Sequence, residues 1–118
     1  MIDLRCGDAL ELLRGRAAGN VAIIADPPYG IGFVPTNRHK VTQRRPRFLP
    51  IVGDDTPFEP AHLLRFETVV LWGANNYADK LPPSKGWLVW DKKNGTSPDN
   101  SSDCELAWTN RDCAVRMF

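Results

Sequence analysis

The chain has 118 residues, which is the size of one small domain, and its 42% hydrophobic and 25% charged residues are the composition of a globular protein. These values exclude a large multidomain enzyme and an intrinsically disordered tail. The net charge of +1 gives no overall attraction to nucleic acid, although the basic residues are unevenly distributed along the chain.

Membrane, secretion and metal signals are lacking in the sequence. The apolar runs are too short for a membrane span, and no basic segment followed by an apolar stretch stands at the N-terminus. The three cysteines, Cys6, Cys104 and Cys113, are odd in number and have no CxxC spacing, which argues against a disulfide framework and a zinc site. We therefore expect a cytoplasmic protein with no metal and no membrane partner.

Taken in chain order, the residue patterns predict strands that alternate with short helices. An alternating run at 2–5 is a candidate strand, and Asp8 then caps an amphipathic helix at 9–14. The apolar run at 21–25 is typical of a central parallel strand that is covered on both faces. The later elements are expected as a helix at 60–66, a strand at 68–72, a weak helix at 75–81, and strands at 87–90, 104–109 and 111–118.

This alternation predicts a single α/β domain over residues 1–118. We expect a mostly parallel sheet with an antiparallel edge hairpin, formed where 104–109 and 111–118 leave no room for a helix between them.

A basic segment without periodicity occupies residues 33–53. Its cationic side chains are Arg38, Lys40, Arg44, Arg45 and Arg47, and no acidic residue lies between Asp26 and Asp54. Loops of this length within a small domain are usually functional or disordered. We expect a loop that is mobile when empty and that contacts the phosphates of double-stranded DNA, with a solvated loop that binds nothing as the alternative.

The strongest chemical signal is Asp26-Pro27-Pro28-Tyr29, which follows the apolar run directly. Ligands of open α/β sheets bind at the carboxyl ends of strands. Two prolines fix the backbone and remove two amide donors, so rigid carbonyls stand beside an acidic acceptor and an aromatic ring. This set suits a planar ligand that carries an NH2 group, such as a nucleobase. The alternative is an ordinary turn in which Tyr29 is a half-buried aromatic.

These residues resemble the catalytic motif of the amino-group DNA methyltransferases, which methylate adenine N6 or cytosine N4 with S-adenosylmethionine. Further segments are similar to phage and bacterial members in which the catalytic motif precedes the cofactor motif. The similar segments, which together span nearly the whole chain, are 7–13, 23–29, 72–77, 87–92 and 104–109. The resemblance implies a partial Rossmann-like class I methyltransferase fold, a site-specific DNA methyltransferase activity, and adenine as the better candidate base, since the Asp-Pro-Pro-Tyr form is more typical of adenine enzymes.

The family mechanism implies roles for individual residues. The flipped base would stack on Tyr29, and its amine would bond to the Asp26 carboxylate and the Pro27 carbonyl, with Pro28 completing the motif. These bonds would localise the nitrogen lone pair for direct attack on the sulfonium methyl. Asp8 and Ala9, together with Asp26, are the implied cofactor-binding residues. Helix capping is an equally weighted role for Asp8.

The chain departs from the family in one respect. The late glycine-rich segment that holds the methionine part of S-adenosylmethionine does not occur before Phe118. We therefore expect a chain that is truncated before the cofactor motif, or a gene fragment, with weak or absent cofactor binding by this chain alone. Completion of the sheet by another chain or by a second copy is the alternative. Calorimetry that detects micromolar binding of S-adenosylmethionine would contradict this expectation.

Three functional hypotheses remain open from the residues. The first is a DNA adenine methyltransferase, and the second is a methyltransferase acting on an RNA base or a protein glutamine. The third is a non-catalytic fragment that binds nucleic acid.

The basic segment generates a testable prediction. Replacing Arg44, Arg45 and Arg47 with Gln should abolish most duplex DNA binding and flatten its salt dependence, by about 0.9 in slope for each phosphate that is no longer neutralised. Fluorescence anisotropy across a salt series measures both quantities. Asp26→Ala is the control, because it should leave DNA affinity intact if binding depends on the basic segment; equal losses of affinity in the two variants would contradict this assignment.

Overall fold

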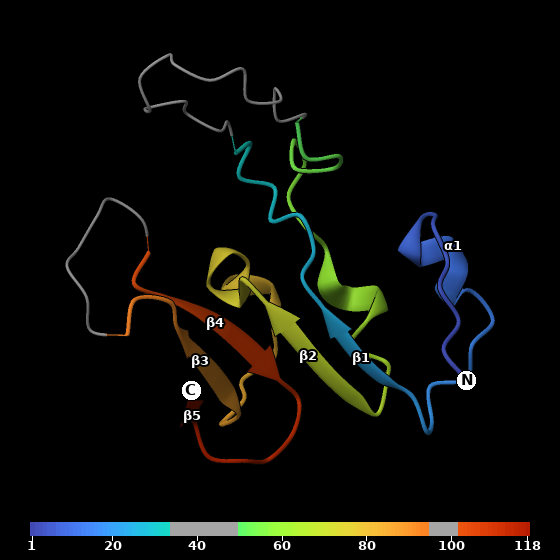
Figure 1. Cartoon of the computed structure of the whole chain (residues 1–118). Coiled ribbons are helices and arrows are strands. Elements are labelled where there is room, and N and C mark those ends of the chain that lie inside the picture. The colour runs from blue at the N-terminus through green and yellow to red at the C-terminus, as the bar shows by residue number, and fades with distance from the viewer. Residues whose placement is uncertain (34–49, 95–101) are drawn as a thin grey trace.

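The computed structural model describes residues 1–33, 50–94 and 102–118 (Figure 1). Strands and short helical turns alternate up to β3, which confirms the predicted α/β class. In chain order the elements are the helix α1 (Ala9–Leu13), strand β1 (Ala22–Ala25), the 3₁₀ turn η1 (Pro60–His62), strand β2 (Thr68–Trp72), the 3₁₀ turns η2 (Ala74–Asn76) and η3 (Ala78–Lys80), and the strands β3 (Trp87–Asp91), β4 (Cys104–Thr109) and β5 (Arg116–Met117).

The five strands of the described residues form one mixed sheet in the order β1-β2-β4-β3-β5. β1 runs parallel to β2, and β5 runs parallel to β3. β4 is antiparallel to both of its neighbours, so the one reversed strand lies inside the sheet. The sheet is therefore less parallel than predicted.

The predicted antiparallel edge hairpin of 104–109 with 111–118 is wrong. Both edges of β4 are already occupied, by β2 and by β3, so β5 joins the outer edge of β3 instead. The Asp91 amide donates to the Phe118 carbonyl at 3.0 Å, and the Phe118 amide donates to the Val89 carbonyl at 3.1 Å. A strand joins whichever edge offers free backbone groups, and adjacency in sequence does not decide which edge that is.

The helical elements are shorter than predicted. Residues 2–5 are not a strand, while α1 forms where expected, with Asp8 as its N-cap. The segments at 60–66 and 75–81 form only 3₁₀ turns, each three residues long. In the described residues no helix has the length and apolar character needed to cross a membrane.

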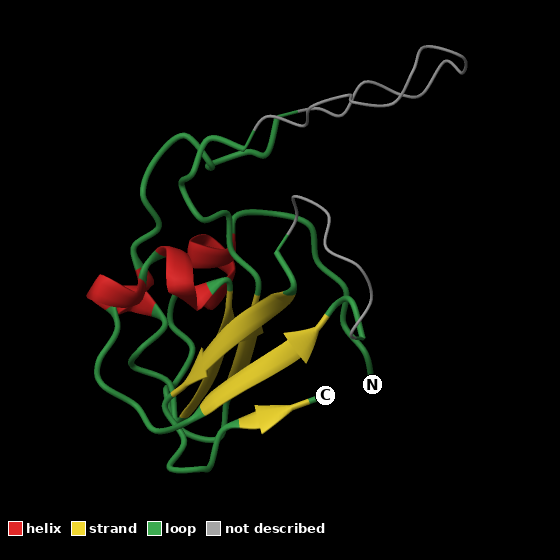
Figure 2. Cartoon of the chain, turned by 90° about the vertical axis from the view of Figure 1, so that its left-hand side faces the viewer, coloured by secondary structure: helices red, strands yellow, loops and turns green. Residues whose placement is uncertain are grey.

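One face of the sheet carries the core. Val69 and Leu71 of β2 are 0% exposed, and the turns η1, η2 and η3 cover this face (Figure 2). The buried cluster consists of Leu63, Phe66, Val69, Leu71, Ala74, Tyr77 and Trp108.

The opposite face is apolar and largely open among the described residues. Side chains alternate along β2, so Val70 and its register partner Ile24 point away from the core. Ile24 is 74% exposed and Phe118 is 65% exposed. The ring of Trp72 meets Phe118 edge to face, with centroids 6.2 Å apart. The prediction that 21–25 forms a central strand covered on both faces is therefore wrong, because β1 is an edge strand with one face open to solvent.

Substitutions on the two faces of the sheet should lower the free energy of unfolding by different amounts. Leu71→Ala should lower the free energy of unfolding by about 2–5 kcal/mol, because it opens a cavity in a closely packed site. Ile24→Ala on the open face should cost less than about 1 kcal/mol. Urea unfolding followed by tryptophan fluorescence measures both values. Losses of similar size would show that the Ile24 face is covered in solution.

Candidate functional site

The carboxyl ends of β1, β2 and β3 lie at one edge of the sheet, because these three strands run in the same direction. β4 is reversed, so its first residues lie at this edge as well. Three residues therefore lie at this edge: Asp26 directly after β1, Gly73 directly after β2, and Glu105 near the start of β4. This is the edge at which open α/β sheets bind their ligands.

Asp26 and Tyr29 are in direct contact. The Tyr29 hydroxyl donates a hydrogen bond to Asp26 Oδ1 at 2.6 Å. Asp26 is exposed, whereas Pro27, Pro28 and Tyr29 are half-buried. No other described residue donates to the Asp26 carboxylate, which leaves Oδ2 as an open acceptor. The acid and the aromatic ring thus lie together as the motif predicts, but the ring is less exposed than a free stacking surface.

Gly73 and Tyr77 hold the Tyr29 ring from the next strand along. Gly73 has a left-handed backbone with φ of 66°, and a Cβ at this position would overlap the Tyr29 ring. The ring centroids of Tyr29 and Tyr77 lie 6.4 Å apart. Tyr77 is itself fixed, because its hydroxyl donates to the Trp72 carbonyl at 2.6 Å. Sequence reasoning missed both positions, although the glycine directly after a strand was a visible signal for Gly73.

The electrostatics of this edge keep the tyrosines neutral. Burial raises the pKa of Tyr29 well above its usual value, and the hydrogen bond to Asp26 and the charges of Asp26 and Glu105 raise it further. Burial, followed by the charge of Asp26, raises the pKa of Tyr77 in the same direction. The Tyr29 hydroxyl is therefore a neutral donor at physiological pH.

Glu105 is a second carboxylate near Tyr29 that the sequence reasoning missed. Lys92 Nζ pairs with Glu105 Oε1 at 2.8 Å, which partly balances its charge. Both side chains are about one-third exposed, so the pair is a modest contributor to stability. The available signal was a lone acidic residue in the otherwise apolar run of β4.

Asp54 is the most strongly hydrogen-bonded acid of the described residues. Its side chain accepts from the amides of Gly30 at 2.9 Å, Ile31 at 3.2 Å and Phe33 at 2.6 Å. Asp54 is 4% exposed, and these backbone donors hold the pKa of its carboxyl below the ordinary 3.8. The stabilisation is fully present above that value and is lost as the pH falls through the lower folded pKa.

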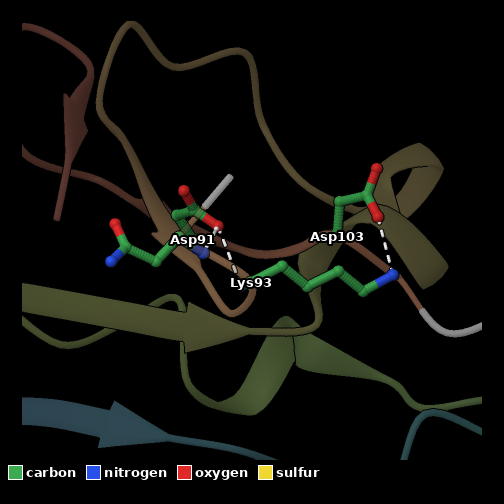
Figure 3. Close-up of polar contacts among 4 residues, drawn as sticks. Asp91, Lys93 and Asp103 are labelled. Atoms are coloured by element: carbon green, nitrogen blue, oxygen red, sulfur yellow. Dashed lines mark hydrogen bonds and ion pairs between the residues drawn. The ribbon is translucent and has the colours of Figure 1, made fainter. Parts of the chain in front are cut away.

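Asp91, Lys93 and Asp103 form polar contacts next to the carboxyl end of β3 (Figure 3). Asp91 Oδ1 accepts from the amides of Lys93 at 2.9 Å and Asn94 at 2.8 Å, so it caps the turn. Lys93 Nζ reaches Asp103 Oδ1 at 2.7 Å with a side chain that is only 12% exposed. Asp91 is half-buried, and its side chain therefore serves the local backbone.

The remaining predicted site residues are not joined to Asp26. Asp8 Oδ1 accepts from the amides of Leu10 at 2.7 Å and Glu11 at 3.3 Å, which confirms the capping role. No hydrogen bond or ion pair links Asp8 or Ala9 to Asp26 or Tyr29, and their cofactor role stays a prediction. The predicted DNA contacts, Arg38, Lys40, Arg44, Arg45 and Arg47, lie outside the described residues.

Comparison of the chain with protein-family models, with curated proteins and with solved structures found no match. Within residues 1–33, 50–94 and 102–118, no group of three His, Cys, Asp or Glu side chains could hold a metal ion. The features that bear on function are therefore the geometry of Asp26 and Tyr29 and the resemblance of their motif.

The contact between Gly73 and Tyr29 generates a prediction. Gly73→Ala should lower the free energy of unfolding by about 2–4 kcal/mol, because strain in the left-handed backbone adds to overlap with the ring. Gly15→Ala is the matched control, since Gly15 has a φ of 73° and no atom within 4 Å of its added Cβ. It should cost only about 1 kcal/mol. Equal costs in thermal unfolding would show that Tyr29 does not pack on Gly73.

Proposed function

We propose that this chain is the catalytic part of an S-adenosylmethionine-dependent DNA methyltransferase that modifies the exocyclic amine of a flipped base, with adenine N6 as the preferred target. One observation carries the proposal. An exposed carboxylate at the carboxyl end of β1 is oriented by the hydroxyl of an aromatic residue on a rigid Pro-Pro turn. This arrangement matches what binding of an aromatic amine requires.

The hydrogen bonding supports different roles for the two oxygens of the Asp26 carboxylate. Oδ1 is held by Tyr29, so Oδ2 is available to accept one amine hydrogen of the base. The Pro27 carbonyl would accept the other, since the following proline has no amide donor to offer. Withdrawal of both hydrogens toward oxygen concentrates the lone pair on nitrogen and makes it a better nucleophile. The partly exposed Tyr29 ring would stack on the base.

The residues at the start of α1 fit an acceptor role toward the cofactor. Asp8 uses Oδ1 to cap the helix, and no described residue donates to its other oxygen. Asp8 and Ala9, with Asp26, would hold S-adenosylmethionine, which when bound supplies an electrophilic methyl group on its sulfonium. Asp8 would both cap the helix and accept from the cofactor.

The place of Asp26 in the sheet also supports the proposal. It follows β1 at the edge where β2 and β3 end as well, and ligands of open α/β sheets bind at this edge. Methylation of an RNA base or a protein glutamine is the second candidate, because the same acceptor pair suits any planar NH2 group. A non-catalytic fragment that binds nucleic acid is the third.

Methyl transfer from labelled S-adenosylmethionine tests the proposal. With the cofactor at millimolar concentration, which compensates for the weak binding expected of this chain alone, label should enter duplex DNA as N6-methyladenine. Asp26→Asn should lower the rate by roughly 10²–10³-fold, because it replaces an anionic acceptor at the reacting amine. Asp55→Asn is the matched control, since it removes the same charge from an exposed position and should leave the rate unchanged.

Two results would contradict the proposal. Label that enters only RNA or protein would favour the second candidate. Failure of the wild-type chain to label DNA, RNA or protein while it still binds DNA would favour the non-catalytic fragment.

A further inference from the structure

Four consecutive backbone amides, those of residues 30–33, donate hydrogen bonds to the buried residue Asp54. The amides of Gly30, Ile31 and Phe33 donate to the Asp54 carboxylate, and the amide of Gly32 donates to the Asp54 carbonyl at 2.8 Å. Gly30 and Gly32 both have left-handed backbone, with φ of 74° and 61°. When left-handed residues alternate with residues of negative φ, successive N–H groups point to the same side and form an anion-binding concavity. Asp54 is the anion that fills it.

This turn begins at the residue after Tyr29. A Cβ at Gly30 would overlap the carbonyl of Thr56, so the two backbones are in close contact at this point. On the other side of Tyr29, an added Cβ at Gly53 would lie 3.5 Å from Pro28 Cγ. The segment around Asp54 therefore contacts the chain on both sides of Tyr29.

We propose that Asp54 is a positioning residue for the Asp26–Tyr29 site: by filling the amide concavity of residues 30–33, it fixes the backbone that carries Tyr29 and so sets the hydroxyl on Asp26. Both Asp54 oxygens are engaged by amides, so it acts through the turn and not on a substrate. The inference deepens the proposed function and rests on it, but the positions of Tyr29 and of the turn can be measured without any activity.

The chemistry of the concavity requires an anion. An Asn at position 54 would keep one carbonyl acceptor and turn an NH2 group toward an amide that is itself a donor. Hydrogen bonds to charged groups are the stronger ones, so their loss should open the turn measurably more often. Asp55 is exposed and is the matched control for the change in charge.

Nuclear magnetic resonance of the full chain tests the proposal. The chain has only two tyrosines, Tyr29 and Tyr77, so ring-labelled tyrosine gives two sets of signals that Tyr29→Phe assigns. In Asp54→Asn, the Tyr29 ring signal should move, and amide exchange of Gly30 and Phe33 should accelerate by about 10-fold or more. The Tyr77 signal should move much less than the Tyr29 signal, because the Tyr77 hydroxyl keeps its hydrogen bond to Trp72. Asp55→Asn should change neither tyrosine.

Gly32→Ala provides a second variant if Asp54→Asn does not fold. An added Cβ at Gly32 has no atom within 4 Å, so it strains the left-handed turn without a clash and leaves Asp54 intact. It should move the Tyr29 signal as well. An unchanged Tyr29 signal in folded Asp54→Asn, or in Gly32→Ala, would overturn the proposal, and so would equal movement of the Tyr77 signal, which would indicate a general structural role.

Activity then separates the two proposals. If wild-type chain transfers methyl groups, Asp54→Asn should lower kcat by about 10-fold while the KM for S-adenosylmethionine stays near the wild-type value, because the acceptor geometry at the base is disturbed. If wild-type chain transfers none, the proposed function fails, but the tyrosine signals still decide whether Asp54 positions Tyr29.

Discussion

The burial of one face of β2 is the constraint on which the other features depend. Val69 and Leu71 are fully buried, and this fixes which side of the strand faces the turns η1 to η3. β2 also pairs with β1 on one side and β4 on the other, so its orientation sets the register of both neighbours. A slip of one residue would place Leu71 on the open face and move Gly73 away from Tyr29. Core packing and site geometry are thus determined by the same strand.

The candidate site combines three separate backbone constraints. The two prolines stiffen the exit from β1, Gly73 permits the close approach of Tyr29, and Asp54 holds the turn that follows. Each constraint limits the freedom of the Tyr29 ring relative to the Asp26 carboxylate. Catalysis that depends on positioning and electrostatics needs this kind of preorganised acceptor. The neutral Tyr29 hydroxyl is suited to orient the carboxylate because it stays protonated over a wide pH range.

The positions of the strands could be predicted from the sequence, whereas the pairing of each strand with its neighbours in the sheet could not. Apolar runs at 68–72, 87–90 and 104–109 correspond closely to β2, β3 and β4. Periodicity reports which residues of a strand can be buried, but it carries no information on which edge a strand joins. For this reason the sequence predicts pairing of 111–118 with 104–109, whereas β5 pairs with β3. The run at 21–25 likewise predicted burial on both faces, although Ile24 is mostly exposed in the described residues.

The sequence by itself determined the features that depend on neighbouring residues: the cap of α1 by Asp8, the rigid turn after β1, and the proximity of Asp26 to Tyr29 three positions later. Only the tertiary structure decided that Asp54 binds the amide of Gly30, which lies 24 positions away, and that Gly73 receives the Tyr29 ring. The physical reason is the range of the interactions. Local contacts follow from backbone geometry and residue type, whereas contacts between residues far apart in the sequence form only when the fold brings them together.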